Sequence, residues 1–131
     1  MSLFLRISRI MESLKHSELE RTVPEIFAEK YPEMAQAFDA SFTEQFDLIA
    51  GKMLDYGINN MKAGTNLETE EDIRFALEGI WFRISDKMAR WQNLLKSGRV
   101  PNYESLYDTF MDIANYAIFA KLISRGLWSG K

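Results

Sequence analysis

A helical repeat of apolar residues runs unbroken through much of the first half of the chain. Its members, spaced by three and four positions, are Ala35, Phe38, Phe42, Phe46, Ile49 and Met53. This spacing returns one side chain per turn to the same face of an α-helix over about five turns, whereas a half-buried strand alternates every two residues. No segment of the chain alternates convincingly with period two. The sequence therefore predicts an all-α fold with a long core helix from about residue 33 to Gly57.

The same spacing predicts helices on both sides of this one. An amphipathic helix is expected near the N-terminus, followed by one or two helical turns between Pro24 and Pro32, because each proline suits a first helical turn. A second long helix should start at Thr69, where Asp72 completes a variant capping box, and end near Gly98. Its expected buried line is Leu77, Trp81 (or Ile80), Ile84, Met88, Trp91 and Leu95.

The last helix is expected to begin after Pro101, with Asn102 as its cap, and to continue to Gly126. Its apolar positions at helical spacing are Leu106, Phe110, Ile113, Ala117 and Phe119 or Ala120. Four to five helices with short connections favour a compact antiparallel helical bundle. The length of 131 residues falls within the usual size of one domain, so we expect a single helical domain over residues 1–131.

Composition narrows the possible chemistry. The chain has no cysteine, which excludes disulfides, zinc–thiolate sites and thiol nucleophiles and favours a reducing, cytoplasmic location. Its net charge of −3 provides no broad electrostatic footprint for duplex nucleic acid, so we do not expect that partner. Arg6 and Arg9 interrupt the apolar N-terminus, so we expect no signal peptide, and no apolar run approaches a membrane-spanning length. The sequence also has no glycine-rich phosphate loop.

Polar residues converge on the last two long helices. On the last helix, an acidic row with spacings of four, four and three residues shares one face: Glu104, Asp108, Asp112 and Asn115. On the preceding helix, a mainly basic face consists of Arg83, Asp86, Lys87, Arg90 and Asn93. These faces fit either solvated surfaces joined by salt bridges or a nucleotide site, in which carboxylates hold Mg²⁺ and basic side chains hold phosphates. Spacing alone does not choose between these interpretations.

A set of short motifs, taken in order, resembles a known family. The motifs are Asp55-Tyr56-Gly57, residues 83–87 (RISDK) with Arg90, and residues 104–117 with Asp108 and DIANYA from Asp112. They resemble the phage and bacterial family called nucleotide modification associated domain 1, over roughly residues 52–122, whereas residues 1–50 carry no resemblance. That family is similar to the all-α nucleotide pyrophosphohydrolases of the MazG type. The resemblance therefore implies a MazG-like helical core.

The resemblance also implies a function, a cofactor and site residues. It implies a Mg²⁺-dependent nucleoside triphosphate pyrophosphohydrolase, in which Asp86, Asp108 and Asp112 are the metal ligands and catalytic carboxylates. The nucleotide would be bound by Asp55, Tyr56, Arg83, Lys87, Arg90 and Asn115.

One departure from the family pattern keeps other functions open. Where the related hydrolases carry a glutamate cluster on their first metal-binding helix, this chain offers Asp86 among Arg83, Lys87 and Arg90. This favours the alternative of a non-catalytic nucleotide-binding protein, or an accessory protein in phage DNA-base modification. A third possibility is a structural protein whose polar faces form interhelical salt bridges. For the first two we also expect a homo-oligomer, because many aromatic positions could bury further surface.

Overall fold

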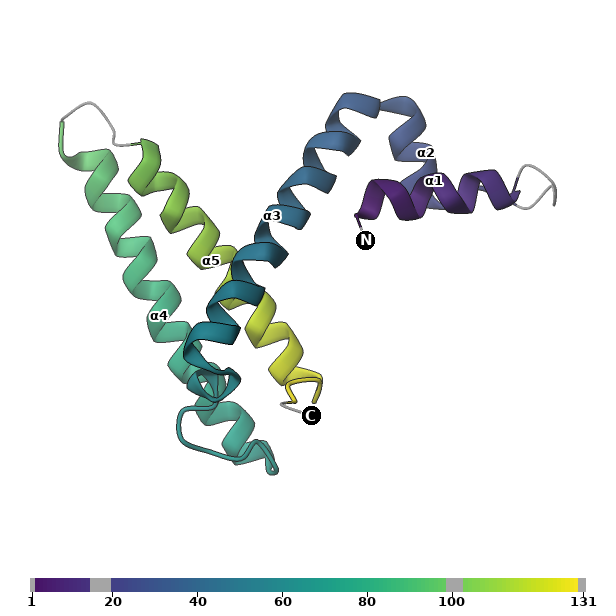
Figure 1. Cartoon of the computed structure of the whole chain (residues 1–131). Coiled ribbons are helices and arrows are strands. Elements are labelled where there is room, and N and C mark those ends of the chain that lie inside the picture. The colour runs from purple at the N-terminus through teal and green to yellow at the C-terminus, as the bar shows by residue number, and fades with distance from the viewer. Residues whose placement is uncertain (1, 15–19, 99–102, 130–131) are drawn as a thin grey trace. The chain divides into compact units, whose positions relative to one another are not determined.

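The structure, a computed structural model, describes residues 2–14, 20–98 and 103–129, and all regular secondary structure in this part is helical (Figure 1). No β-strand occurs among the described residues, so the predicted all-α class is confirmed. In chain order the elements are α1 (Leu3–Leu14), α2 (Val23–Lys30), α3 (Pro32–Tyr56), the short 3₁₀ helix η1 (Ile58–Met61), α4 (Glu70–Lys96) and α5 (Tyr103–Ser124). The expected cap Asn102 lies outside the described residues.

The chain forms two compact units, unit 1 (Met1–Leu48) and unit 2 (Ile49–Lys131). The boundary between them, after Leu48, falls within α3. Each unit has its own cluster of buried apolar side chains. The expectation of a single domain stays a prediction, and the two units are described separately.

Unit 1 has a small core. Ile7 of α1, Ala28 of α2 and Ala35 of α3 are buried together, with Leu3 and Met11 packed against them. The backbone N–H of Phe4 donates to the Asp39 carboxylate at 2.8 Å, which ties α1 to α3. The predicted buried stripe of α3 is wrong in this unit, because its aromatic members are largely exposed: Phe38 at 45%, Phe42 at 55% and Phe46 at 68%.

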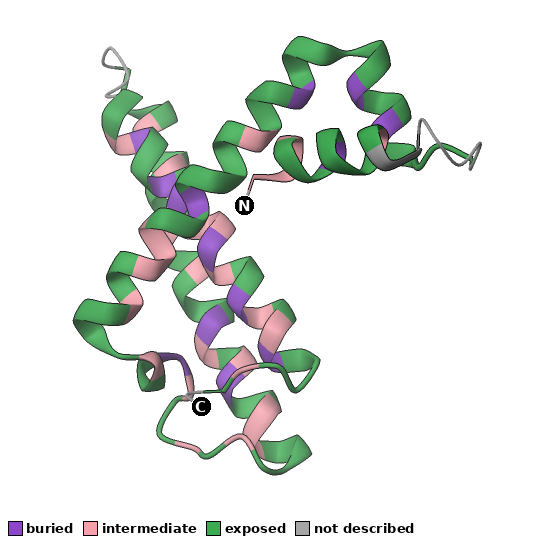
Figure 2. Cartoon of the chain, turned by 45° about the vertical axis from the view of Figure 1, so that its right-hand side comes forward, coloured by how far each residue is buried: buried purple, intermediate pink, exposed green. Residues whose placement is uncertain are grey.

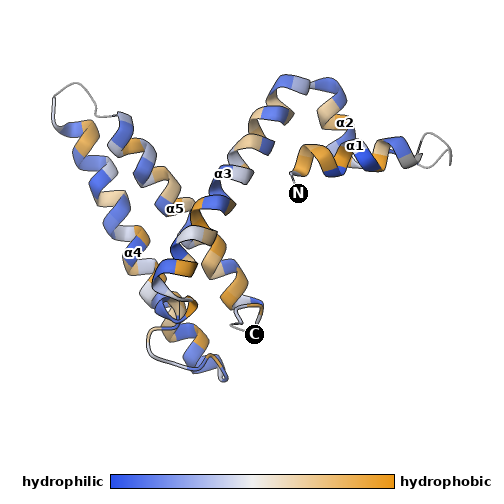
Figure 3. Cartoon of the chain, in the orientation of Figure 1, coloured by the Kyte–Doolittle hydropathy of each residue, from blue (hydrophilic) through white to orange (hydrophobic). Residues whose placement is uncertain are grey.

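Unit 2 is built on the antiparallel pair α4 and α5, which form the most extensive helix–helix contact (Figure 1). Two buried residues from each of these helices, together with one from η1, form the core cluster: Met61, Ala76, Ile80, Phe119 and Ile123. Figure 2 shows buried positions along α4 and α5. Figure 3 shows that α4 is largely hydrophilic, whereas the C-terminal half of α5 is largely hydrophobic. The core of unit 2 therefore lies toward the N-terminal half of α4 and the C-terminal half of α5.

The structure corrects the expected buried face of α4. Ile80 is 2% exposed, whereas Trp81 is 62% exposed, so the alternative position Ile80 is the core residue. Met88 and Leu95, which were expected on the same line, are also exposed. The buried side chains Ala76 and Ile80 stand one turn apart on α4. The buried face of α4 is narrower than the line of apolar residues in its sequence, because α4 packs mainly on one neighbouring helix, α5.

Local signals place the helix ends as expected. Thr69 caps α4, because its side-chain oxygen accepts the backbone N–H of Asp72 at 3.0 Å. Gly57 ends α3 with φ +81°, a backbone conformation that residues with a Cβ rarely adopt. This turn lets η1 start immediately after α3. At the C-terminus, the indole N–H of Trp128 donates to the carbonyl of Ile58 at 2.9 Å and so fixes the chain end of unit 2 against η1.

Candidate functional site

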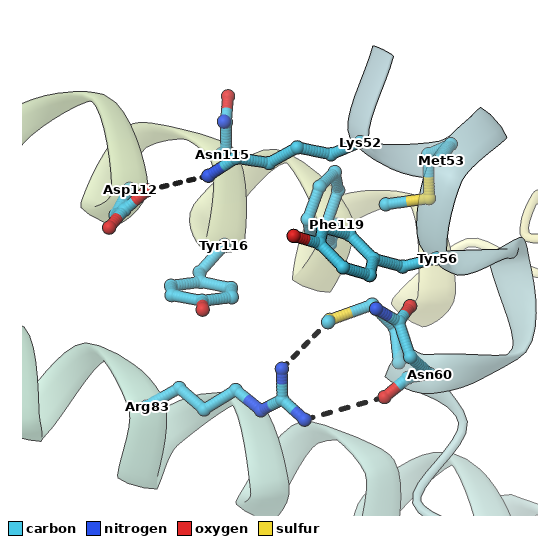
Figure 4. Close-up of a pocket in the computed structure, with 10 residues that line it drawn as sticks. Lys52, Met53, Tyr56, Asn60, Arg83, Asp112, Asn115, Tyr116 and Phe119 are labelled. Carbon is cyan, nitrogen blue, oxygen red and sulfur yellow. Dashed lines mark hydrogen bonds and ion pairs between the residues drawn. The ribbon is translucent and has the colours of Figure 1, made fainter. Parts of the chain in front are cut away.

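A pocket of about 270 Å³ opens in unit 2 between the end of α3, η1, α4 and α5 (Figure 4). Ligand sites for drug-sized molecules typically enclose roughly 300–1,000 Å³, so this pocket suits a small ligand. It combines charged, amide and aromatic side chains. The lining residues are Lys52, Met53, Tyr56, Asn60, Met61, Arg83, Asp112, Asn115, Tyr116 and Phe119.

Helical spacing explains how so many of these residues reach one pocket. From α5, Asp112, Asn115, Tyr116 and Phe119 stand at i, i+3, i+4 and i+7, which is a single helix face. Lys52 and Tyr56, one turn apart on α3, form a second short face. The turn at Gly57 then brings η1 back to complete the wall.

Asp112 is the centre of the polar contacts in this pocket. Its Oδ1 accepts from Lys52 Nζ at 3.2 Å, and its Oδ2 pairs with Lys87 Nζ at 2.9 Å. The three side chains come from α5, α3 and α4, so one carboxylate connects three helices. Burial raises the pKa of Asp112, but hydrogen bonds and positive charge from Lys87 and Lys52 together lower it by more. The net pKa lies below its ordinary value of 3.8, so the carboxylate is ionised at neutral pH.

Arg83 faces the pocket from the side opposite Lys52 (Figure 4). Its guanidinium stands 5.8 Å from the centre of the Tyr116 ring, within the range of a cation–π contact. It also donates to the carbonyl of Asn60 at 3.5 Å and lies 4.0 Å from the sulfur of Met61. Both of these are long contacts, and a guanidinium has five N–H donors. Arg83 can therefore donate further hydrogen bonds to a ligand.

Aromatic rings form the apolar part of the wall. Tyr116 and Phe119 meet edge to face at 6.2 Å, and Phe119 packs in the same manner on Trp128 at 5.2 Å. Tyr56 is 74% exposed and its ring projects toward the pocket (Figure 4). Among the polar residues, Asn115 is buried at 3% exposure and lines the same cavity. The pocket therefore presents flat apolar surface beside cationic groups.

The structure brings together some of the site residues expected from sequence. Tyr56, Arg83, Asp112 and Asn115 line the pocket, and Lys87 contacts it through Asp112. The other expected residues do not line it and are exposed: Asp55, Asp86, Arg90 and Asp108.

Sequence reasoning did not assign Lys52 or Tyr116 to the site, although both carry much of its geometry. One signal for Lys52 was available, because it stands one turn before Tyr56 on the same helix face.

The three carboxylates expected to hold magnesium are not grouped around one point in the structure. Within the described residues, which include Asp86, Asp108 and Asp112, no group of three or more acidic or histidine side chains is placed to hold a metal ion. Both oxygens of Asp112 are instead paired with lysine ammonium groups. The magnesium ion stays a prediction, and the cationic side chains of the pocket are groups that can bind an anion directly.

Another hollow, of about 290 Å³, lies in unit 1 and differs in chemistry. All of its lining residues are apolar: Leu3, Phe4, Ile7, Pro24, Phe27, Ala35, Phe38 and Phe42. Its described lining has no side chain that could carry charge or catalysis. The pocket of unit 2 is chosen as the candidate site because it combines cationic, acidic and aromatic side chains.

Comparisons with known proteins add no relative. No family model matches the chain, and neither a curated protein nor a solved structure matches it. Among the described residues, no helix combines the length and the apolar character needed to cross a bilayer. The function is therefore argued from the pocket itself.

Proposed function

We propose that unit 2 binds a small phosphorylated ligand with a planar ring, of which a nucleotide is the best fit, without needing a metal ion. The observation that carries the proposal is the charge around one carboxylate. Lys52 and Arg83 bring two positive charges to the lining, where Asp112 is the one acidic side chain among the described residues, and Lys87 adds a third positive charge through its contact with Asp112. The net charge of these side chains is positive, although the net charge of the whole chain is −3. A concave site with this balance attracts anions.

The aromatic wall supports a nucleotide over a simple anion. Tyr56 and Tyr116 stand between Lys52 on one side and Arg83 on the other (Figure 4). Base-on-aromatic stacking contributes about 1–3 kcal/mol per base in proteins that bind single strands, so such rings hold a base while a cation holds its phosphate.

The test measures binding of a nucleoside monophosphate, a nucleoside triphosphate and inorganic phosphate by titration calorimetry in the presence of a chelator. The native protein is compared with Arg83→Met, and Arg90→Met is the matched control, because Arg90 lies on the same helix but outside the pocket. Hydrogen bonds to charged groups contribute about 1.5–3 kcal/mol, so Arg83→Met should weaken nucleotide binding by about tenfold or more. Arg90→Met should bind as the native protein does.

Two further measurements define the ligand class. Tyr116→Leu should weaken binding of the nucleotide and leave binding of inorganic phosphate nearly unchanged, because only the nucleotide has a base to stack. Release of pyrophosphate from the triphosphate is followed with Mg²⁺ and with chelator. If pyrophosphate is released only with Mg²⁺ and the release is lost in Asp112→Asn, the protein is a hydrolase and the proposal of binding without a metal ion is wrong. No saturable binding of any probe at millimolar concentration would refute the proposal.

A further inference from the structure

Lys52 and Lys87 hold the Asp112 carboxylate in the way that an anion-binding site holds its anion. Two ammonium groups from different helices converge on one carboxylate, Lys87 at 2.9 Å, a distance typical of a charge-assisted hydrogen bond, and Lys52 at a longer 3.2 Å. A phosphate group accepts the same donors and carries about −1.5 to −2 charge at pH 7, more than a carboxylate does. The same pair of lysines can therefore hold either Asp112 or a phosphate.

The lysines are placed for such an exchange. The side chain of Lys52 is 46% exposed and that of Lys87 is 27% exposed, while Asp112 is 20% exposed. Neither ammonium group is sealed in the core, and each sits on a flexible four-carbon stem. Lys52 and Asp112 also line the pocket directly. An anion that enters the pocket can thus reach the ammonium of Lys52 without any movement of a helix.

We infer that the Asp112 carboxylate is an internal counter-ion, which the phosphate of the bound ligand replaces on Lys52 and Lys87. This inference rests on the proposed function and adds the role of Asp112 within it. Before binding, Asp112 neutralises part of the lysine charge and holds α3, α4 and α5 together through its two contacts. When the phosphate arrives, the two negative groups repel each other and compete for the same donors. Asp112 therefore lowers the affinity of the site for anions.

If Asp112 is a counter-ion, removing its charge should change ligand affinity in the opposite direction from removing the charge of a metal ligand or catalytic carboxylate. Neutralising an internal counter-ion releases two ammonium groups to the ligand, so binding tightens. Neutralising a metal ligand weakens binding or abolishes turnover. A single variant, Asp112→Asn, separates the two roles because it removes the charge and retains the size of the side chain.

The experiment titrates a nucleoside monophosphate and, separately, inorganic phosphate into the native protein, Asp112→Asn and Asp108→Asn, with chelator present and at low salt. Asp108 is the matched control, because it stands one turn before Asp112 on α5, is exposed and does not line the pocket. Partly exposed ion pairs typically contribute up to about 1 kcal/mol, so Asp112→Asn should bind both probes about fivefold more tightly. Asp108→Asn should stay within about twofold of the native protein.

The outcomes distinguish the counter-ion role of Asp112 from the proposed nucleotide-binding function. Native binding that is unchanged or weaker in Asp112→Asn overturns the counter-ion role while the proposed function stands. Absence of native binding to either probe refutes the proposed function, and the counter-ion role with it. Tightening for the nucleotide but not for inorganic phosphate also overturns the inference, because the phosphate alone should exchange with Asp112.

A second measurement uses the native sequence and so does not depend on whether a variant folds. The pKa of the Asp112 carboxyl is followed by carbon NMR with and without saturating nucleoside monophosphate. The two lysines hold this pKa below its ordinary value in the free protein. If the phosphate takes over the ammonium groups, the pKa must rise on binding. An unchanged or lower pKa at saturation would show that the lysines stay with Asp112.

Discussion

Ile123 is the most informative position for testing the core of unit 2, because its side chain is among the largest that are fully buried, at 1% exposure. It lies in the cluster with Met61, Ala76, Ile80 and Phe119. Ile123→Ala removes three carbon atoms, and each buried carbon contributes about 0.8 kcal/mol, or about 2.4 kcal/mol in all. The cavity left behind adds to this loss, so we expect the free energy of unfolding to fall by about 3–4 kcal/mol.

A matched control stands on the same helix. Ile118 is 38% exposed, so Ile118→Ala makes the same chemical change outside the core and should cost less than about 1 kcal/mol. The two variants have the same helix propensity change, because isoleucine is replaced by alanine in both. Any difference between them therefore reports burial.

Urea unfolding followed by tryptophan fluorescence is the appropriate assay. The chain has three tryptophans, Trp81, Trp91 and Trp128, and all of them belong to unit 2. The signal therefore reports the unit in which the substitution is made. The midpoint should fall with an unchanged slope, since the surface exposed on unfolding stays the same. Equal losses in Ile123→Ala and Ile118→Ala would refute the assigned core and the rotation of α5 that it implies.

Three further predictions concern the site and the helix ends. Asp112→Asn should lower the free energy of unfolding at pH 7 by about 0.5–1.5 kcal/mol. The native pKa of Asp112 is lowered, so its contribution to the free energy of unfolding is complete above the ordinary value of 3.8 and is lost as the pH falls through the native pKa. The difference in free energy of unfolding between the native protein and Asp112→Asn should therefore shrink from about pH 5 to pH 2. A difference that stays constant over this range would contradict the ion pairs. Gly57→Ala should destabilise the protein by about 1 kcal/mol, because φ at this position is +81°. Gly51→Ala should stabilise it by about 0.5–1 kcal/mol, because Gly51 lies inside α3 with open space around its Cβ position. Thermal unfolding that gives both substitutions the same sign would contradict the assigned end of α3. Trp128→Phe removes the donor to the Ile58 carbonyl and should cost about 1–2 kcal/mol in urea unfolding, and a neutral effect would mean that this hydrogen bond does not hold the chain end.

The candidate site was only partly accessible from sequence. Arg83, Lys87, Asp112 and Asn115 belong to the polar helical faces, and Tyr56 belongs to a motif of the family resemblance. The structure places each of them in the pocket or on its central carboxylate. The geometry assigned to them differs from the expectation. Asp112 was expected to stand with Asp86 and Asp108 around a metal ion, whereas its structural partners are two lysines. Spacing within one helix cannot show which neighbouring helix supplies the counter-charge.

The sequence by itself determined the local structure. The spacing of apolar residues specified the long helices, and Thr69, Gly57 and Gly98 marked where they begin or end, since capping and positive φ depend only on nearby residues.

Only the tertiary structure decided which side of each helix is buried and which residues meet. Ile80 lies in the core while its neighbour Trp81 is exposed, because the rotation of α4 about its own axis is set by how it packs on α5. In the same way, Lys52 meets Asp112 across 60 residues of sequence, a contact that arises from the packing of separate helices and that no local pattern encodes.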